Sequence, residues 1–332
     1  MKINRQQMIS TEPAWINYMH AKGAKLGLPV AGNFELTGRC NFGCKMCYVH
    51  NSDGSDELTD DQWIEISLGS GMKIDLEETL HSGQVFHFNK TNDNEYCGFV
   101  GEDLLILKQR NSTVLCKIVN EHTEQAVRNF FNLDILVDSQ LCSVDGLRFL
   151  TNDLYSTIFS FICSQNNNVK RIEGMVHCLY EKGPYINYKN ISVHKFPQLD
   201  ELVDDMHWRA HGFGYRADYI SQAAKYIREH QSSFTKEHLQ KIGYGNAKNK
   251  LCEIKGIGRK VADCICLISL EYFDVVPIDR HIFNYSQRAF GVKINKLTKT
   301  TYNDIQRMWK ERFGIYAGVA QLHIFKRYLV KK

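Results

Sequence analysis

The chain has 332 residues, and its 43% hydrophobic and 23% charged content is typical of globular proteins. No apolar run approaches the ~18 residues that cross a bilayer, and the N-terminus "MKINRQQMISTEPAW" lacks the apolar region of a secretory signal, so we expect a cytoplasmic protein. The net charge of +4 is uneven, because residues 205–332 carry 23 Lys and Arg against 11 Asp and Glu, whereas the first 204 residues carry 18 against 26. This basic half indicates either a polyanionic partner or a solvated basic surface.

Residues 1–71 form the first of three expected zones. They are predicted to contain a strand in "GNFELTG", a cysteine loop, a turn in "NSDGSD" and a helix in "ELTDDQWIEISLGSGM". The 11 cysteines of the chain are an odd number, which is typical of reduced thiols or metal ligands rather than of a disulfide framework. Only Cys40, Cys44 and Cys47 have metal-type spacing, and His50 would complete a Cys3His set for zinc.

The second and third zones differ in the period of their apolar residues. In residues 72–150, "SGQVFHFNK", "YCGFVGEDLLILKQ" and "STVLCKIVN" alternate apolar and polar positions, which predicts an antiparallel sheet. In residues 151–332, "DLYSTIFSFICSQ", "ADYISQAAKYIREH", "KVADCICLISLEYF" and "RHIFNYSQRAF" have helical spacing. The expected fold class is therefore α+β, with a sheet domain followed by a mostly helical domain and a short cysteine-rich appendage in front.

The stretch "LCEIKGIGRKVADCICL" combines a glycine turn with a lysine at the start of a helix. Gly256 and Gly258 permit positive φ and close approach of another backbone, and the free N–H groups of such a turn suit a phosphate. Val261, Cys264, Ile265 and Ile268 predict one buried helix face. Lys260 lies in the first turn, where the helix dipole and desolvation predict a lowered pKa and a nucleophilic amine. The alternative is an exposed or phosphate-contacting lysine.

A second stretch, "VVPIDRHIF", places Asp279 just before another helix. Asp is a favoured N-cap residue, so capping alone would explain it. If the chain returns to Lys260, the carboxylate would instead stabilise a cationic sugar and move protons. Both explanations are retained at this point.

These two stretches closely resemble the 8-oxoguanine DNA glycosylase/AP lyase branch of the helix-hairpin-helix, Gly-Pro-Asp superfamily. Four further segments fit the same branch in the same order: "LHSGQVFHF", "FSFICSQNNNVKRIEGMV", "HGFGYRADYI" and "GIYAGVAQLHIF". The resemblance covers roughly residues 72–332, and several ordered matches are far more specific than one motif.

The resemblance implies a role for each matched residue. Lys260 would attack the sugar and form a Schiff base, and Asp279 would assist as electrostatic partner and proton shuttle. Gly83, Cys264, Gln321 and Phe325 would form the lesion-base pocket, with the Gly83 carbonyl accepting from the N7 hydrogen that 8-oxoguanine has and guanine lacks. Residues that contact DNA would be Asn166, Asn167, Asn168, Arg171, Tyr215, Arg216, Gly256, Gly258 and His281. Outside this context, the asparagine run would be a polar turn and Tyr215 a packed aromatic.

The N-terminal zone resembles another family. "FELTGRCNFGCKMCYVH" is similar to the cluster loop of radical S-adenosylmethionine enzymes, in which Cys40, Cys44 and Cys47 would hold a [4Fe–4S] cluster. The barrel that such enzymes need is several times longer than residues 1–71, which favours a truncated, inert remnant over a working cluster or zinc site.

Three other functions stay open. They are a related glycosylase with another purine specificity, a non-catalytic DNA-binding module, and a radical enzyme with an accessory DNA domain. Retention of both Lys260 and Asp279 argues against the second, and the missing barrel argues against the third. The resemblance implies a monomer that binds duplex DNA containing 8-oxoguanine opposite cytosine, needs no cofactor for excision, does not bind membranes, and is nucleoid-associated if bacterial.

Overall fold

The computed structural model describes residues 63–66, 73–92, 94–120, 122–135, 143–188, 191–291 and 296–330. These residues belong to one compact unit, Trp63–Lys332. The predicted strand "GNFELTG" and the cysteine loop with Cys40, Cys44, Cys47 and His50 lie outside the described residues. In the parts of the chain that are described, no helix is both long and apolar enough to cross a bilayer.

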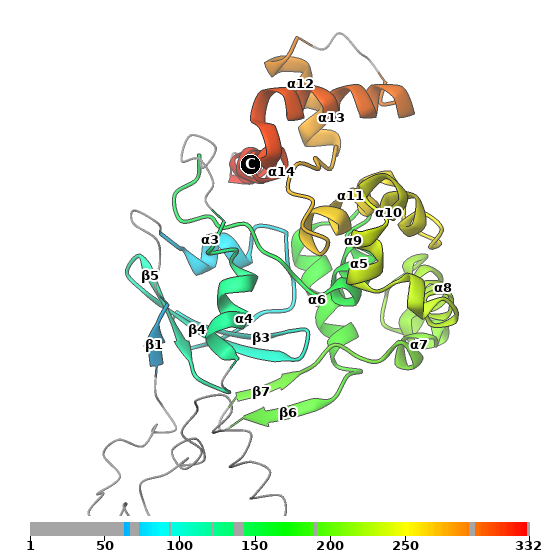
Figure 1. Cartoon of the computed structure of the whole chain (residues 1–332). Helices are drawn as coiled ribbons and strands as arrows, with labels where there is room; N and C mark the ends of the chain where they lie inside the picture. Colours follow the sequence, from blue (N-terminus) through cyan, green and yellow to red (C-terminus); the bar gives the residue numbers. More distant parts are fainter. Residues whose placement is uncertain are drawn as a thin grey trace, which may run out of the picture. The chain divides into compact units, whose positions relative to one another are not determined.

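An antiparallel sheet forms the first half of the unit (Figure 1). Its spatial order is β1-β5-β4-β3-β2. Asn94, Gly101 and Asn111 adopt positive φ in the three tight turns that join β2 to β5, a conformation that suits hairpin turns. The strands are β1 (Trp63–Glu65), β2 (Asn89–Asn92), β3 (Glu95–Val100), β4 (Asp103–Arg110) and β5 (Thr113–Lys117). The predicted antiparallel sheet is thus confirmed, although "SGQVFHFNK" becomes a strand only at its end.

Strand β1 contradicts the helix that was predicted across residues 57–72. Trp63–Glu65 is extended and pairs with Leu115–Lys117 of β5. The backbone N–H of Ile66 then donates to the Val114 carbonyl at 2.9 Å, and the Ile66 side chain is buried in the core beneath the sheet. Pairing with a strand 50 residues away is tertiary context, and tertiary context overrides the local helical pattern.

Both faces of the central strands are buried, which differs from the predicted alternation of apolar and polar positions. Leu105 and Leu107 of β4 face one core with α3 (Leu76–Leu80) and α4 (Thr123–Phe130), whereas Leu104 and Ile106 face a smaller one. A hairpin, β6 (Tyr185–Tyr188) and β7 (Ile191–His194), covers that second face through Val193. A sheet covered on both faces has continuous apolar strands, as "LLIL" has here.

The second half of the unit is mostly helical, as predicted, and its helices pack around one large apolar core and, at α12 and α13, a smaller one. After α5 (Leu154–Cys163) and α6 (Val169–Tyr180), the chain forms α7 (Asp205–Ala210), α8 (Arg216–Glu229), α9 (Lys236–Lys241), α10 (Tyr244–Leu251), α11 (Arg259–Ile268), α12 (Arg280–Ala289), α13 (Lys299–Phe313) and α14 (Ala317–Val330). The single-turn 3-10 helices η1 (Leu199–Leu202), η2 (Gln231–Ser233) and η3 (Gly314–Tyr316) connect them.

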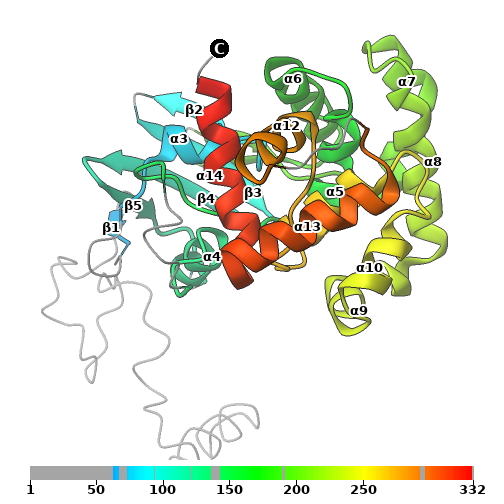
Figure 2. The same ribbon diagram turned by 90° about the horizontal axis from the view of Figure 1, so that it is seen from above.

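Two features of the helices position the site. First, α10 and α11 form a hairpin around Gly256–Gly258, and every residue of α11 from Val261 to Ile268 is buried. The prediction of a single buried face was therefore too narrow. Second, α14 lies between the sheet side and the helical side in Figure 2. Lys326 on α14 donates to the His81 carbonyl at 3.4 Å, so α14 reaches the segment that follows α3.

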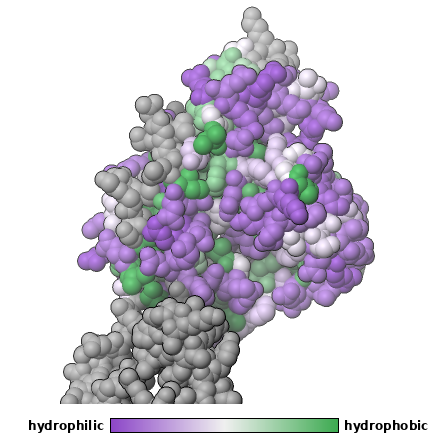
Figure 3. Space-filling view, in the orientation of Figure 1, coloured by the Kyte–Doolittle hydropathy of each residue, from purple (hydrophilic) through white to green (hydrophobic). Residues whose placement is uncertain are grey.

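The face of the unit seen in Figure 3 is mostly hydrophilic, with small and scattered apolar patches. This distribution is normal for a surface that faces water or a polar ligand.

Candidate active site

A cavity of about 460 Å³ lies among the segment after α3 and the helices α5, α11, α12 and α14. It brings together residues that are far apart in the sequence, from Ser82 to Phe325. The predicted residues that line it are Gly83, Asn167, Asn168, Lys260, Cys264, Asp279, His281, Gln321 and Phe325. Both proposed catalytic residues and all four proposed base-pocket residues therefore share one cavity.

Lys260 occupies the first turn of α11, as predicted, with Gly258 as the N-cap residue. Its ammonium lies 5.4 Å from the centre of the Phe161 ring, a cation–π arrangement. Gly256 in the turn before it has φ +89°, and an added Cβ would come within 2.7 Å of the Tyr219 side chain. The turn thus needs glycine at position 256. At Gly258, no described atom lies within 4 Å of the place of a Cβ, which leaves room for another backbone.

The protonation of Lys260 differs from what its sequence position predicts. Burial lowers the pKa of the Lys260 ammonium, but the Cys264 sulfur and the Asp279 carboxylate raise it, and the net shift of the pKa is upward. Burial also raises the pKa of the Cys264 thiol, and the neighbouring Lys260 ammonium opposes that shift. The prediction of a lowered pKa is wrong for the free protein, because it considered the helix dipole and desolvation but not the Cys264 and Asp279 side chains beside the ammonium.

Asp279 both caps a helix and faces the cavity. Its Oδ1 accepts from the backbone N–H of Ile282 at 2.7 Å, which makes it the N-cap of α12. The same carboxylate lines the cavity beside Lys260 and acts on its pKa. The two explanations for this residue are therefore compatible: capping fixes the carboxylate at the place where it meets the ammonium.

The predicted base-pocket residues line the cavity from three segments. Gly83 has φ +86°, and a Cβ there would lie 3.9 Å from the Phe325 ring. Gln321 is buried one turn before Phe325 on α14, and the Phe325 ring lies 6.1 Å from the ring of His281. With Cys264 on α11, these groups offer a carbonyl, an amide, a thiol and an aromatic face to a planar ligand.

Other predicted DNA-contact residues form a second group outside the cavity lining. Hydrogen bonds join these residues to one another and to their loops. Arg216 is buried, and its guanidinium donates to the carbonyls of Gln165 and, at 3.2 Å, Asn166. The Tyr215 hydroxyl donates to the Gln165 carbonyl at 3.2 Å, although 48% of this residue is exposed. Arg171 donates to the Gly212 carbonyl at 3.0 Å. The asparagine loop and the loop before α8 thus form one connected surface.

Several residues that hold this arrangement were not predicted from the sequence. Gln165 donates to the Gly256 carbonyl at 2.7 Å, which ties the asparagine loop to the α10–α11 hairpin. Asp263 is fully buried on α11 and accepts hydrogen bonds from Lys248, Tyr244, Tyr302 and Gln306. A charged residue inside "VADCICLI" was a visible signal for such a network, whereas nothing in the sequence marked Gln165 or Phe161.

Two family models match consecutive parts of the chain. Residues 68–158 match 8-oxoguanine DNA glycosylase, N-terminal domain. Residues 159–311 match the HhH-GPD superfamily base excision DNA repair protein. The first match contains most of the sheet and the second contains the hairpin with Lys260 and the N-cap Asp279.

Individual proteins are similar over the same region. N-glycosylase/DNA lyase OGG1 of Arabidopsis thaliana is 29% identical over 292 residues, which cover 80% of each chain. The N-glycosylase/DNA lyase of Saccharomyces cerevisiae is 32% identical over 216 residues, or 56% of this chain and 57% of the relative. Among solved structures, MBOgg1 in complex with a low-affinity DNA ligand has a TM-score of 0.70 at 26% identity, covering 82% of this chain and 100% of that chain.

Proposed function

Since this chain belongs to the HhH-GPD superfamily of base excision DNA repair proteins and carries the N-terminal domain of 8-oxoguanine DNA glycosylases, we propose that it is a bifunctional N-glycosylase/DNA lyase that excises 8-oxoguanine opposite cytosine from duplex DNA. The observation that carries the proposal is the shared cavity. A lysine and a carboxylate face the same space as Gly83, Gln321 and Phe325. A module that only binds DNA has no use for this pairing of a nucleophile with a charged partner.

The cavity lies among helices of the protein, so a damaged base can enter it only after its nucleotide leaves the DNA helix. Extrusion costs a few kcal/mol of stacking and pairing, and an aromatic residue in the gap offsets part of that cost. Tyr215 is half exposed and is held by the asparagine loop, which suits this role. Arg216 and Asn166 beside it offer guanidinium and amide groups to the orphaned cytosine. His281 and the glycine turn are assigned to the backbone phosphates.

Selection of 8-oxoguanine over guanine is assigned to one hydrogen bond. N7 of guanine is an acceptor, whereas N7 of 8-oxoguanine carries a hydrogen and donates. The Gly83 carbonyl therefore attracts the N7 hydrogen of 8-oxoguanine and repels the N7 lone pair of guanine. Gln321 bonds the edge of the same base, and Phe325 and Cys264 lie against its two faces. A hydrogen bond to one atom of the base distinguishes 8-oxoguanine from guanine more strongly than the shape of the pocket does.

The chemistry uses only groups of this chain. The Lys260 amine, after losing a proton, attacks C1′, and the bond between C1′ and the base breaks with its electron pair leaving on the base. The base takes up a proton, and the sugar opens to a Schiff base with Lys260. β-Elimination then breaks the bond to the 3′ phosphate. Asp279 stabilises the cationic sugar and carries protons between these steps.

Because the pKa of Lys260 is raised, the first step requires a group that accepts its proton. The ammonium has to give up its proton in the complex, and Asp279 is the charged neighbour that can receive it. Transfer between the two removes both charges at once, which a water-excluding site favours.

Borohydride trapping on a duplex with 8-oxoguanine opposite cytosine tests the proposal. Borohydride reduces a Schiff base to a stable amine, so the full chain should become covalently linked to the DNA. Lys260→Gln should abolish the adduct. The matched control is Lys255→Gln, since Lys255 lies in the same hairpin but pairs with Asp218 outside the cavity. A trapped adduct of normal yield in Lys260→Gln would exclude the mechanism. Equal excision of guanine or another purine would exclude the specificity.

The proposal also covers the oligomeric state, the location and the salt dependence of DNA binding. We expect the enzyme to act as a monomer in the cytoplasm, and at the nucleoid if the source is bacterial. The excess of Lys and Arg after residue 205 supplies the phosphate contacts. Affinity should fall with salt with a log–log slope of about −0.9 for each phosphate contacted.

A further inference from the structure

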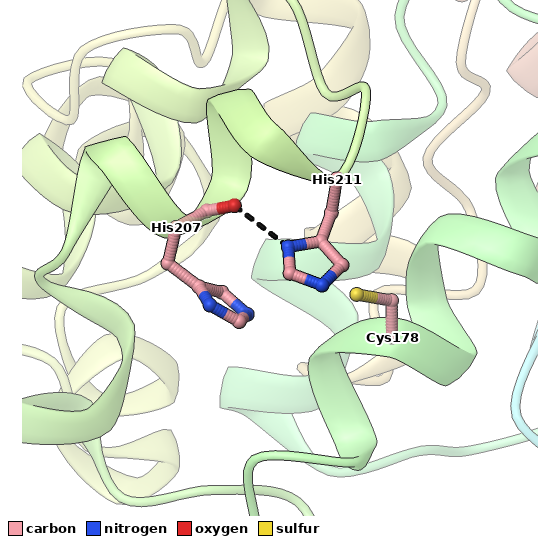
Figure 4. A group of neighbouring side chains, drawn as sticks. All are labelled: Cys178, His207 and His211. Carbon is pink, nitrogen blue, oxygen red and sulfur yellow. Dashed lines mark hydrogen bonds between the residues drawn. The ribbon is translucent and has the colours of Figure 1, made fainter.

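Three side chains with metal-binding atoms meet outside the cavity. Cys178 comes from α6, His207 from α7, and His211 from the C-terminal end of α7. The Cys178 Sγ and one ring nitrogen of each histidine lie within 4.8 Å of one another. Figure 4 shows the three side chains grouped together. A tetrahedral zinc ion with bonds of about 2.0–2.3 Å needs ligand atoms roughly 3.5 Å apart. Binding would therefore draw the three ligand atoms closer together than they are in this structure.

The hydrogen bond of His211 prepares its ring for a metal. Its Nδ1 donates to the His207 carbonyl at 2.8 Å, which leaves the lone pair on Nε2. In Figure 4 this second nitrogen is directed toward the Cys178 sulfur. Metal-binding histidines usually donate their other ring nitrogen to a carbonyl or carboxylate in this way. His207 and His211 are also four residues apart, the spacing with which two histidines of one helix bind zinc.

The chemistry of the three ligands is compatible with this use. A bound metal displaces the thiol proton of Cys178 to solvent, as zinc does at protein cysteines. One sulfur and two imidazoles favour zinc over magnesium or calcium.

We propose that Cys178, His207 and His211 bind one Zn²⁺ ion, with water in the fourth position. The ion would connect α6 to the residues just before the loop 212–215. These are the elements that Arg171 already links through the Gly212 carbonyl. Tyr215 projects from this loop, so the metal would restrain the residue assigned to the gap in the DNA. We call this restraint on Tyr215 the clamp. The clamp rests on the proposed function, whereas zinc binding does not.

Cobalt titration of the full chain tests the site. The N-terminal cysteines are a competing source of thiolate, so the parent protein carries Cys40→Ser, Cys44→Ser and Cys47→Ser. Addition of Co²⁺ to the metal-free parent should produce a thiolate-to-cobalt charge-transfer band that saturates at one equivalent. Cys178→Ser should remove the band. His211→Gln should weaken Co²⁺ binding at least tenfold.

Matched controls exist for both substitutions. Cys252 is a partly buried free cysteine outside the cluster, and Cys252→Ser should keep the band. His230 donates its Nδ1 to the Tyr226 carbonyl at 2.9 Å, the bond that His211 makes, but belongs to no such cluster among the described residues. His230→Gln should therefore bind Co²⁺ as the parent does.

A second measurement keeps the outcome clear. Zinc that binds only the folded state should raise the melting temperature of the parent and leave that of Cys178→Ser unchanged. Absence of both the band and the melting shift would overturn the site, as would a band that persists in Cys178→Ser. If zinc binds but excision by the chelated parent is unaltered, the clamp alone is wrong. The cobalt band and the melting shift do not depend on whether Lys260 forms a Schiff base, so failure of the site and failure of the proposed function are distinguishable.

Discussion

Gln165 donates from Nε2 to the carbonyl of Gly256 at 2.7 Å and so joins the asparagine loop to the glycine turn before Lys260. These two segments are separated by 91 residues in the sequence. Gly256 can take this position because its φ of +89° and the Tyr219 ring against it exclude a side chain. The loop assigned to the orphaned base and the turn assigned to the phosphates are thereby held in one fixed relation.

Replacing Gln165 should lower the efficiency of excision from DNA that contains 8-oxoguanine, without unfolding the protein. Loss of one hydrogen bond costs about 1 kcal/mol, so Gln165→Ala should lower kcat/KM for excision about fivefold. The matched control is Gln222→Ala, because Gln222 makes its amide bond to Asp218 within α8. Single-turnover excision and DNA binding measured together check the effect. An equal loss in both variants would show that the amide bond has no specific role.

Asp279→Asn separates the two roles of this residue. Asn is as good an N-cap as Asp, so the bond to the Ile282 N–H and the stability of α12 should survive. The charge beside Lys260 is lost, and base release should slow by two or more orders of magnitude. Asp153 caps α5 in the same manner outside the cavity lining, so Asp153→Asn is the control. A normal single-turnover rate for Asp279→Asn would remove its charge from the mechanism.

The sequence predicted the parts of this protein that depend on local pattern and on ordered motifs. Helical spacing predicted α5, α8, α11 and α12. The motif matches predicted that Lys260 and Asp279 act together, and both residues line one cavity. It failed where distant segments decide the outcome. Strand β1 exists because β5 offers it a partner, and Lys260 is held protonated by Asp279 from another helix.

The same limit applies to the cluster on α6 and α7. The spacing of His207 and His211 was visible in the sequence, but Cys178 reaches them only through the packing of α6. Gln165 had no signal at all, because an amide that bonds a distant carbonyl has no local pattern. Side chains that act across elements are thus the part of a site that a single sequence does not reveal.

Acid should destabilise the protein through His323 on α14. Burial, and then the charge of Arg148, lower the pKa of His323 from 6.5 to about 4. Its Nδ1 accepts from the Val144 N–H at 3.2 Å, so that nitrogen has to stay unprotonated in the fold. Between pH 6.5 and 4 the unfolded chain binds more protons than the folded one. Stability is therefore complete above that window and falls by about 3 kcal/mol as the pH drops through it.

His323→Asn tests this, because an amide oxygen can still accept from Val144. Urea unfolding at several pH values should show a flatter acid limb in this variant than in the parent. Some loss of stability in acid should remain in the variant. Burial lowers the pKa of His87 to about 3, so that residue adds its own acid sensitivity. His230→Asn, at an exposed position, should leave the acid limb unchanged. A parent-like acid limb in His323→Asn would show that another group is responsible.

The last prediction concerns the N-terminal segment and where it can be removed. No proposed glycosylase residue precedes Gly83, and lysine attack followed by elimination needs no redox chemistry. We therefore expect deletion of residues 1–62 to leave excision of 8-oxoguanine within a few-fold of the full chain. Deletion of residues 1–71 should behave differently, because it removes β1 from the edge of the sheet and the buried Ile66 from its core. Loss of a buried isoleucine alone costs about 2–5 kcal/mol.

Melting temperatures and single-turnover rates of the two deletions distinguish the possibilities. If the shorter deletion is folded but inactive, residues 1–62 supply a DNA contact or a part of the site, and the segment is no remnant. If both deletions are equally stable, β1 contributes nothing and the domain boundary belongs at residue 71 after all. Cys40, Cys44 and Cys47 need a separate measurement. Stoichiometric iron and sulfide in anaerobically purified full chain, together with cleavage of S-adenosylmethionine, would make the cysteine loop a working site, and excision would then be one of two activities carried by this chain.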